Sequence, residues 1–426
     1  MDIIRKSTKI LLEEGFYAII IYFYIWLKRK RFVSLCIQKD WMKASVVGEK
    51  LIKLLPERID YYLYLALCYR NLGEINSAST ILYKGLQKIT PPDLLLNNVE
   101  NNLFTNNLVE SHYIYLGGEQ NLGCFEHTDK INEEIYLTKI TTLSNFESEK
   151  WFYYQLYQNY ESIRLITPKI INIIERKSVS LALITMEKID GVVPKIEGKV
   201  LKEVVRISKL INSIQFGEIK HLIPTPDFNL EFQLTNKNYP NHPIFALHSF
   251  TGIHRKKTNQ RLFQLIYKRM KQLKYSSKTI ELIRNLEKLI FDSEIYNWIC
   301  PEIDYTLQHG DFNSHNMIWD ERKEKLYIID WGNTRVGPKW VDLAGLFGQL
   351  KLSYFEIEHL LLGDKENKTS FSPKEKMLFL YSLIVTWIIV FTRNELEGNL
   401  HLYLEPAIKN IEFTINEMNI RWAVNH

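Results

Sequence analysis

The stretch that decides the fold is His309–Ala344, HGDFNSHNMIWDERKEKLYIIDWGNTRVGPKWVDLA. Two short apolar runs in it, 316–319 and 326–329, are rich in residues that favour β-strands. The polar segment 320–325 between them is typical of a turn, so the sequence predicts an antiparallel hairpin. Because the two open ends of such a hairpin are neighbours, residues that begin the first strand and end the second are expected to lie together.

Three polar side chains stand at this open end of the predicted hairpin. Asn316 begins the first strand, Asp330 ends the second, and Asp311 lies in the loop before them. Carboxylate and amide oxygens are the ligands that Mg2+ prefers, and a further carboxylate can receive or orient the hydroxyl of an acceptor. Single Asp and Asn residues usually mark turns or caps, but this arrangement of three is rarely reached by chance. The stretch therefore predicts a phosphoryl-transfer site.

The same stretch resembles the aminoglycoside phosphotransferase and choline kinase family, small-molecule kinases with a protein-kinase-like fold. HGDFNSHN matches the family's catalytic loop HGDxxxxN, IIDW matches its IDW, and GPKWVDLA matches its G-x-x-x-x-D-L-A tail. A protein kinase would instead carry HRD, DFG and APE segments. The resemblance implies that Asp311 is the catalytic base and that Asn316 and Asp330 hold Mg2+. It also implies that His309 and Asp342 brace the catalytic loop.

A glycine-rich turn lies between predicted strands further upstream. Residues 113–116 lead into GGEQNLG at 117–123, and 134–140 form another predicted strand. Glycines let backbone amides approach phosphate oxygens, although a plain hairpin turn is the alternative. The resemblance makes this turn the phosphate-binding loop, with Gln and Asn at the tip where the family commonly has Ser and Asn. The residues assigned to nucleotide binding here are Gly117, Gly118, Gln120 and Asn121.

Lys139 lies inside the strand predicted at 134–140. A lysine flanked by apolar residues is costly unless its ammonium reaches a partner, the alternative being a side chain that bends out to solvent. The resemblance implies that Lys139 clamps the α- and β-phosphates of ATP and pairs with a glutamate of the next helix. Glu149 fits best because Leu156 follows at the family's spacing, and Glu147 remains open.

Two more strands are predicted at 168–174 and 178–184. The following segment, 186–191, matches the family's hinge, where backbone groups hydrogen-bond adenine. The hinge residues assigned to the cofactor are Met186, Glu187 and Ile189.

The rest of the chain is predicted to form the larger lobe. A helix is expected at 200–215, a loop insertion with short elements at 216–260, and long helices at 263–298. In the family this region often shapes the acceptor pocket. A cationic acceptor would need acidic or aromatic groups, although solvated helix faces explain the same residues equally well. The candidates are Tyr354, Glu356, Glu358, Trp387 and Glu395.

The first hundred residues carry a helical pattern over 41–55, 61–72 and 76–89. They resemble a tetratricopeptide repeat, with packing residues that include Tyr62 and Gly85. A partial copy of the repeat lies about 34 residues earlier in the chain. In this copy Gly48 occupies a position where the repeat usually has a bulky residue. An unrelated helical hairpin is the alternative.

An apolar run near the N-terminus, 16–27, is followed by the basic residues 28–31. At about 12 residues it falls short of the roughly 20 needed to span a bilayer. We predict a buried first helix, and the alternative is an interfacial helix whose basic end meets anionic lipid. A second apolar stretch, 377–392, is predicted as a buried helix.

The composition is that of a globular protein. Of 426 residues, 46% are hydrophobic and 24% charged, and the formal net charge of +5 does not favour nucleic acid as a partner. The four cysteines have no paired spacing, which favours reduced thiols in the cytosol over disulfides or a zinc site. We expect a cytoplasmic protein, with peripheral contact at the inner face of the membrane as a candidate.

These observations predict an α+β chain with a bilobal protein-kinase-like fold behind an all-α, tetratricopeptide-like region. We expect that region at 1–100, the ATP-binding small lobe at 101–191 and the catalytic large lobe at 192–426. The expected activity is an ATP- and Mg2+-dependent kinase that phosphorylates a hydroxyl of an amino-alcohol, sugar or aminoglycoside. The alternative is a pseudokinase scaffold whose helical repeats dock a partner protein, which an active kinase could also do.

Overall fold

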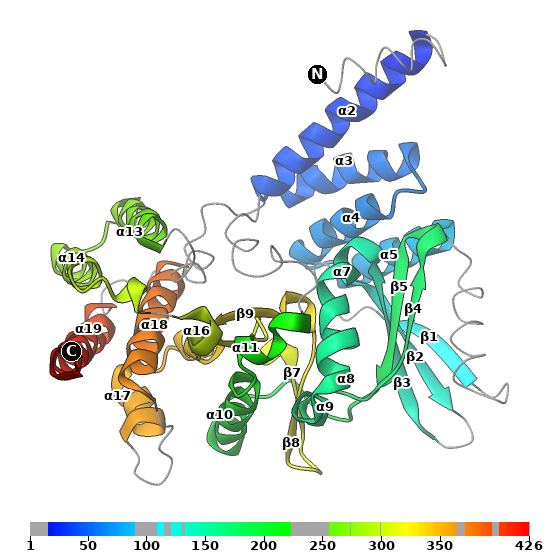
Figure 1. The fold of residues 1–426 in the computed structure, drawn as a ribbon. Coiled ribbons are helices and arrows are strands. Elements are labelled where there is room, and N and C mark those ends of the chain that lie inside the picture. The colour runs from blue at the N-terminus through cyan, green and yellow to red at the C-terminus, as the bar shows by residue number, and fades with distance from the viewer. Residues whose placement is uncertain are drawn as a thin grey trace. The chain divides into compact units, whose positions relative to one another are not determined.

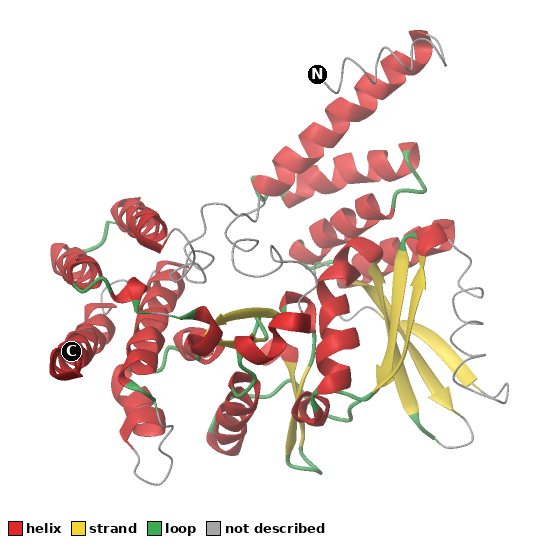
Figure 2. Cartoon of the chain, viewed as in Figure 1, coloured by secondary structure: helices red, strands yellow, loops and turns green. Residues whose placement is uncertain are grey.

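The described residues of the computed structural model group into two compact units. The first is formed by residues 1–147 with 168–188, and the second by 148–167 with 189–426. Figure 1 labels their helices and strands, and Figure 2 colours them by type. The expected α+β architecture with a helical N-terminal region is confirmed. The structure describes residues 16–89, 109–114, 121–129, 133–222, 255–272, 274–298, 300–363, 371–393 and 400–425.

The helices of the first unit follow one another with short turns. Asp40 caps the second of them by accepting the backbone N–H of Lys43. Gly73 lies in the turn before the last of these helices and has φ +82, a left-handed conformation that favours glycine. The helical spans predicted between residues 41 and 89 are confirmed. The helices are α2 (Phe16–Ile37), α3 (Trp41–Leu54), α4 (Ile59–Asn71) and α5 (Ile75–Ile89).

Small residues allow these helices to pack closely, as the repeat pattern predicts. A Cβ at Gly85 would lie 2.6 Å from Cγ of Tyr62, so α5 can approach α4 only with glycine there. A Cβ at Gly48 would lie 3.1 Å from Leu65 and 3.1 Å from Phe32. Phe32 of α2 therefore fills the space that a bulky residue at position 48 would take.

The first helix is not buried over its whole length, so the prediction of a buried helix is wrong for its N-terminal half. Ile20 is 50% exposed and Leu27 is 58% exposed, whereas Phe32 is 1% exposed against α3 and α4. The helix is held at one end only. No helix in the described ranges is long and apolar enough to cross a membrane.

A five-stranded antiparallel sheet completes the first unit, with strand order β1-β2-β3-β5-β4. Lys139 of β3 lies opposite Cys124 of β2 on one side and Ile184 of β5 on the other. The predicted strands at 134–140, 168–174 and 178–184 are all found. The strands are β1 (Val109–Ile114), β2 (Asn121–Asp129), β3 (Ile135–Thr142), β4 (Ile170–Arg176) and β5 (Leu181–Glu187).

One face of this sheet shares a core with α4 and α5. Leu82 of α5, Phe125 of β2 and Leu183 of β5 belong to one buried cluster, and each is at most 3% exposed. The rings of Tyr83 and Tyr113 add a contact at 5.0 Å between centroids. The helical region and the sheet are therefore parts of one hydrophobic core.

A chain of polar side chains crosses the same covered face. His127 lies 2.7 Å from the hydroxyl of Ser111 through Nδ1 and 2.8 Å from that of Thr138 through Nε2. Thr138 is 2.9 Å from Thr185 on the next strand. Because burial favours the neutral ring, the pKa of His127 falls from 6.5 to about 4.

We expect this histidine to make the chain less stable in mild acid. Its folded-state pKa is depressed, so the stability it contributes is present above pH 6.5 and is lost as the pH falls toward 4. Urea unfolding at pH 7.5 and pH 5 should show a loss of about 2 kcal/mol from this group. His127→Gln should lack that part of the loss, whereas His221→Gln, at an exposed histidine, should keep it. Equal pH dependence in all three proteins would contradict the prediction.

The second unit is mainly helical, with two short strand pairs. β6 pairs with β9 and β7 pairs with β8, both antiparallel. Its α-helices are the end of α7 (Leu143–Trp151), α8 (Tyr157–Asn159), α9 (Glu161–Ile166), α10 (Gly198–Asn212), α11 (Phe216–Ile219), α13 (Arg255–Gln272), α14 (Ser277–Asp292), α15 (Pro301–Asp304), α16 (Val341–Gln349), α17 (Tyr354–Ile357), α18 (Pro373–Arg393) and α19 (Leu400–Asn425). Its strands are β6 (Tyr305–Gln308), β7 (Met317–Asp320), β8 (Lys325–Ile328) and β9 (Arg335–Pro338).

The core of the second unit is built around α18, which packs against α16 and α19. A Cβ at Gly348 of α16 would lie 2.4 Å from Cγ2 of Thr386, so these two helices are in close contact. Trp387 is fully buried. The prediction of a buried helix at 377–392 is confirmed, and α16 is held firmly behind the predicted catalytic loop.

Candidate active site

The predicted hairpin forms and has the predicted register. Met317 of β7 lies opposite Ile328 of β8, and residues 321–324 make the turn. The backbone N–H of Ile329 donates to the carbonyl of Asn316 at 3.0 Å, which extends the pairing past the strand ends. Asn316 therefore lies at the same end of the hairpin as Asp330, as the sequence predicts.

Asp311 has an exposed carboxylate held by two amide side chains of its own loop. Asn313 donates from Nδ2 to Oδ1 of Asp311 at 2.7 Å. Asn316 donates from Nδ2 to Oδ2 at 3.0 Å and to the carbonyl of Asp311 at 2.9 Å. Both carboxylate oxygens are thus oriented while the group stays open to solvent. Because the amide nitrogen of Asn316 donates to Asp311, its amide oxygen faces away from that carboxylate.

His309 is completely buried behind the loop and holds its backbone. Its Nδ1 accepts the N–H of Asp311 at 3.3 Å, and its Nε2 lies 3.0 Å from the carbonyl of Ile329. A neutral ring with its proton on Nε2 satisfies both contacts. Burial lowers the pKa of His309, which favours that neutral form. The ring thus links the catalytic loop to the end of β8, which agrees with the bracing role inferred from the sequence.

Asp342, in the first turn of α16, binds the backbone of the same loop. Its carboxylate accepts the N–H of His309 at 2.5 Å and that of Gly310 at 3.2 Å. Burial raises the pKa of Asp342, and the charge of Arg335 and the hydrogen bonds from these two backbone amides oppose that rise. The aspartate therefore fixes the loop from the helix side.

Arg335 of β9 was not singled out in the sequence, yet its charge acts on this site. It lies opposite Gln308 in the β6–β9 pair, next to the loop. Its Nε is buried and has no hydrogen-bond partner within the described residues. Burial lowers the pKa of Arg335, and the negative charges of Asp342 and Asp311 oppose this. The guanidinium therefore supplies positive charge that acts on both carboxylates.

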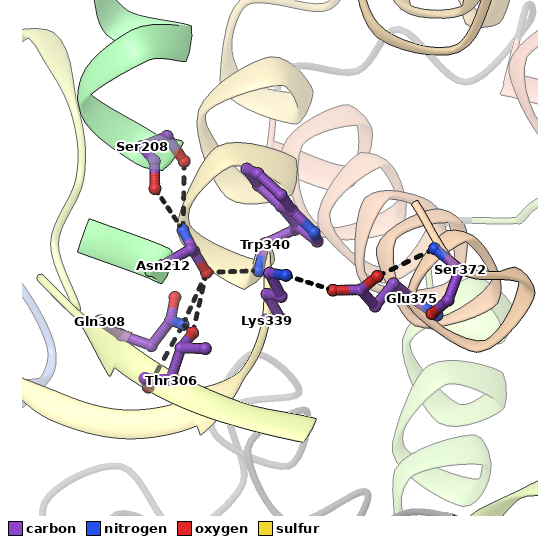
Figure 3. Close-up of polar contacts among 8 residues, drawn as sticks. All are labelled: Ser208, Asn212, Thr306, Gln308, Lys339, Trp340, Ser372 and Glu375. Carbon is purple, nitrogen blue, oxygen red and sulfur yellow. Dashed lines mark hydrogen bonds and ion pairs between the residues drawn. The ribbon is translucent and has the colours of Figure 1, made fainter. Parts of the chain in front are cut away.

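A second residue that the sequence reasoning missed is Asn212, at the end of α10. Its Oδ1 accepts from the hydroxyl of Thr306 at 2.9 Å, from Nε2 of Gln308 at 3.3 Å and from the backbone N–H of Trp340 at 2.8 Å (Figure 3). Its Nδ2 donates to the carbonyl of Ser208 at 2.7 Å. Asn212 thus joins α10, the strand β6 that leads into the catalytic loop, and the segment before α16.

Asp330 is exposed and adopts φ +61, in the left-handed region. The next residue, Trp331, is fully buried and stacks on Phe152 with centroids 4.2 Å apart and planes at 8°. Its indole N–H donates to the carbonyl of Ile328 at 3.2 Å. Because Trp331 is fixed on both sides, the turn that carries Asp330 is held in place.

The nucleotide-binding predictions fall partly on described residues. Thr138 and Ile140 point to the helix-covered face of the sheet, so Lys139 between them points to the opposite face. Glu149 is buried, and its Cγ would lie 3.2 Å from a Cβ placed on Gly332, just beyond Asp330. Glu147 is exposed, which favours Glu149 in the predicted pair. The pairing of Lys139 with Glu149 stays a prediction.

The remaining assigned residues are partly outside the described part of the chain. Gly117, Gly118 and Gln120 lie outside it, and Asn121 begins β2. Met186 and Glu187 end β5, and Ile189 follows within two residues and is buried.

The candidate groups for a cationic acceptor have structural partners instead. Glu356 forms a capping box with Ser353 at the start of α17. The hydroxyl of Tyr354 donates to Glu358 at 3.2 Å, and Trp387 is fully buried in the core. Glu395 lies outside the described residues. The described members of this set thus have structural contacts, and their part in an acceptor site stays a prediction.

Residues 245–360 match a family described as the phosphotransferase enzyme family. This part of the chain is similar to that family. The match encloses the catalytic loop, the hairpin and α16, which are the elements that assemble the site. The resemblance inferred from the HGD, IDW and DLA motifs is therefore confirmed.

One curated relative and two solved structures are among the proteins similar to this chain. The LicA homolog of Mycoplasma capricolum subsp. capricolum is 27% identical over 115 residues, which are 27% of this chain and 47% of the relative. The chain thus matches about half the length of that relative. Choline kinase LicA from Streptococcus pneumoniae is 14% identical, with a TM-score of 0.35 and coverage of 75% of this chain and 99% of that one. Plasmodium vivax ethanolamine kinase is 17% identical, with a TM-score of 0.36 and coverage of 78% and 80%.

Proposed function

We propose that this phosphotransferase-family chain is an ATP- and Mg2+-dependent kinase that phosphorylates a hydroxyl of a small molecule. The observation that supports this most is the oriented, exposed carboxylate of Asp311 on a loop braced by His309 and Asp342. Such a carboxylate can accept the proton of an acceptor hydroxyl as it attacks phosphorus. The acceptor is an amino-alcohol, a sugar or an aminoglycoside-type compound. The reaction takes place in the cytoplasm, where ATP is available.

The residues present fit a magnesium ion. Asn316 turns its amide nitrogen to Asp311, which leaves an oxygen for a cation, and Asp330 is an exposed carboxylate at the same end of the hairpin. Two such oxygens are the donor set expected when Mg2+ takes one or two protein ligands and completes its shell with phosphates and water. Bound there, the ion would neutralise phosphate charge.

The protein's own contribution is positioning and charge. Phosphoryl transfer passes through a loose transition state, so little covalent chemistry falls to the enzyme. Asp311 orients the hydroxyl, and the backbone of its loop is fixed by His309 and Asp342 on opposite sides. We assign the α- and β-phosphates of ATP to Lys139, supported by Glu149, and adenine to the backbone of Met186, Glu187 and Ile189.

The proposed cofactor site predicts a ligand-linked thermal shift. ATP with Mg2+ at about 100 times its dissociation constant should stabilise the chain by about 2.7 kcal/mol. Asp330→Asn should lose most of this shift, because the amide keeps the left-handed backbone but lacks the charge that holds the ion. Glu321→Gln, which removes an exposed carboxylate from the turn of the same hairpin, should behave as wild type. The measurement is thermal unfolding with ATP, with and without Mg2+.

The outcome separates the two functional hypotheses. A shift that needs both Mg2+ and Asp330 supports the kinase and justifies a screen of amino-alcohols, sugars and aminoglycosides. If folded wild-type protein shows no shift, the kinase proposal fails. The chain would then be a scaffold, and its helical region would be the place to look for a partner protein.

A further inference from the structure

The N-terminal half of α2 exposes a continuous apolar surface, which we call the α2 stripe (Ile20, Phe23, Tyr24 and Leu27). These residues follow the helical spacing i, i+3, i+4, i+7, so they share one face, and Ile21 beside that face is also 48% exposed. A single exposed apolar residue needs no explanation, but an apolar face on consecutive turns indicates an interaction surface. The exposed fractions are 50% for Ile20, 41% for Phe23, 47% for Tyr24 and 58% for Leu27.

The structure holds the two ends of α2 differently. Phe32 is 1% exposed and packs with Leu35 and Cys36 against α3 and α4. Towards its N-terminus α2 diverges from α3, as Figure 1 shows. The helix is therefore anchored at its C-terminal end and presents the α2 stripe away from that anchor.

A cluster of positive charge follows the stripe directly. Lys28, Arg29, Lys30 and Arg31 are consecutive, and α2 contains no acidic residue. None of the four forms an ion pair with a carboxylate in the described part of the chain. Two contact aromatic rings of the same helix: Lys28 lies 5.1 Å from the ring centre of Tyr24, and Lys30 lies 4.4 Å from that of Trp26. Such contacts leave the positive charge uncompensated.

We propose that α2 binds an anionic lipid surface, with the α2 stripe at the boundary of the acyl chains and residues 28–31 at the headgroups. Apolar burial alone gives weak membrane binding, and a polybasic segment is the second signal that makes it stable. No helix in the described ranges is long and apolar enough to span the bilayer, so the contact is peripheral. A second copy of the chain would offer the same positive charges rather than complementary negative ones.

The experiment is co-sedimentation of the full chain with phosphatidylcholine vesicles, with and without phosphatidylglycerol. Wild type should sediment with the anionic vesicles only, and less so at high salt. Lys30→Gln with Arg31→Gln should weaken binding roughly 25-fold, at about fivefold per basic residue. Phe23→Ser with Leu27→Ser should weaken it at least about tenfold. Each variant's thermal midpoint checks that Phe32 still anchors the helix.

A matched control removes exposed apolar residues elsewhere. Leu402 and Phe413 of α19 are 59% and 66% exposed, and their double replacement by Ser should leave sedimentation unchanged. Wild type that stays in the supernatant with anionic vesicles would overturn the proposal, as would equal binding to both vesicle types. So would α2 variants that bind as wild type but alter the oligomeric state, because that would assign the stripe to a second copy. None of these outcomes depends on kinase activity.

Discussion

Replacing Asp311 by Asn is expected to lower turnover by about 10²- to 10⁴-fold, the usual contribution of a positioned general base. The amide is nearly isosteric with the carboxylate but cannot accept the proton of the acceptor hydroxyl. Because Asp311 contacts Asn313 and Asn316 within one loop, and not the buried core, the fold should survive the change. The measurement is the steady-state rate with the best acceptor from the screen, beside the nucleotide-induced thermal shift of the same variant.

The two readouts should diverge for this variant. Turnover is expected to fall while the ATP–Mg2+ shift persists, since Asp311 is assigned to the acceptor and not to the nucleotide. Glu321→Gln serves as the control, because it also removes one carboxylate but lies in the turn at the far end of the hairpin. Turnover near that of wild type for Asp311→Asn would refute the assignment of the base.

Gly310→Ala is expected to destabilise the chain by at least about 3 kcal/mol. Gly310 has φ +85, and a Cβ there would lie 2.0 Å from the carbonyl oxygen of Asn333. A backbone carbonyl cannot move aside as a flexible side chain would, so the loop must shift. That shift would stretch the hydrogen bond from the N–H of Gly310 to Asp342. Urea unfolding measures the loss of stability, and the ATP–Mg2+ thermal shift reports the damage to the site.

Gly345→Ala provides the matched control on α16, the helix that carries Asp342. A Cβ at Gly345 would meet nothing within 4 Å, and alanine favours a helix over glycine by about 0.5–1 kcal/mol. This variant should therefore be as stable as wild type or slightly more so. If Gly310→Ala were as well tolerated as Gly345→Ala, the close approach to Asn333 would not describe the loop in solution.

The catalytic side of the site could be predicted because its information is local. Strand-forming runs on either side of a polar turn define the hairpin, and antiparallel pairing then brings Asn316 and Asp330 to one end. Asp311 follows from its short distance along the chain. The bracing by His309 and Asp342 came from the resemblance to a family, since nothing in the spacing itself places α16 against the loop.

The supporting network could not be predicted in the same way, because its partners are far apart in sequence. Asn212 meets Trp340 across 128 positions and Gln308 across 96. Its only local signal is that it continues the buried stripe of α10, one turn after Ser208, where an apolar residue would be expected. A polar pair on an apolar face indicates a buried network but does not say what completes it. The sequence around Arg335 gives even less indication of a role at the site, because a basic residue in a short strand is usually explained by solvent exposure.

The first helix shows the limit of hydrophobicity as a guide to burial. Residues 16–27 are apolar enough for a core position, yet only the later part of α2, around Phe32, meets the helices that follow it. Periodicity describes a helix face but not whether a neighbour exists to cover it.

The core that α4 and α5 share with the sheet limits where the chain can be truncated. Leu122, Phe125 and Ile140 are at most 3% exposed because Leu82 and Leu86 lie over them. A kinase portion cut away from residues 16–89 would uncover this apolar sheet face and would be prone to aggregate. The helical region is therefore required to cover the sheet. A related protein without it would need other apolar residues to cover the same sheet face.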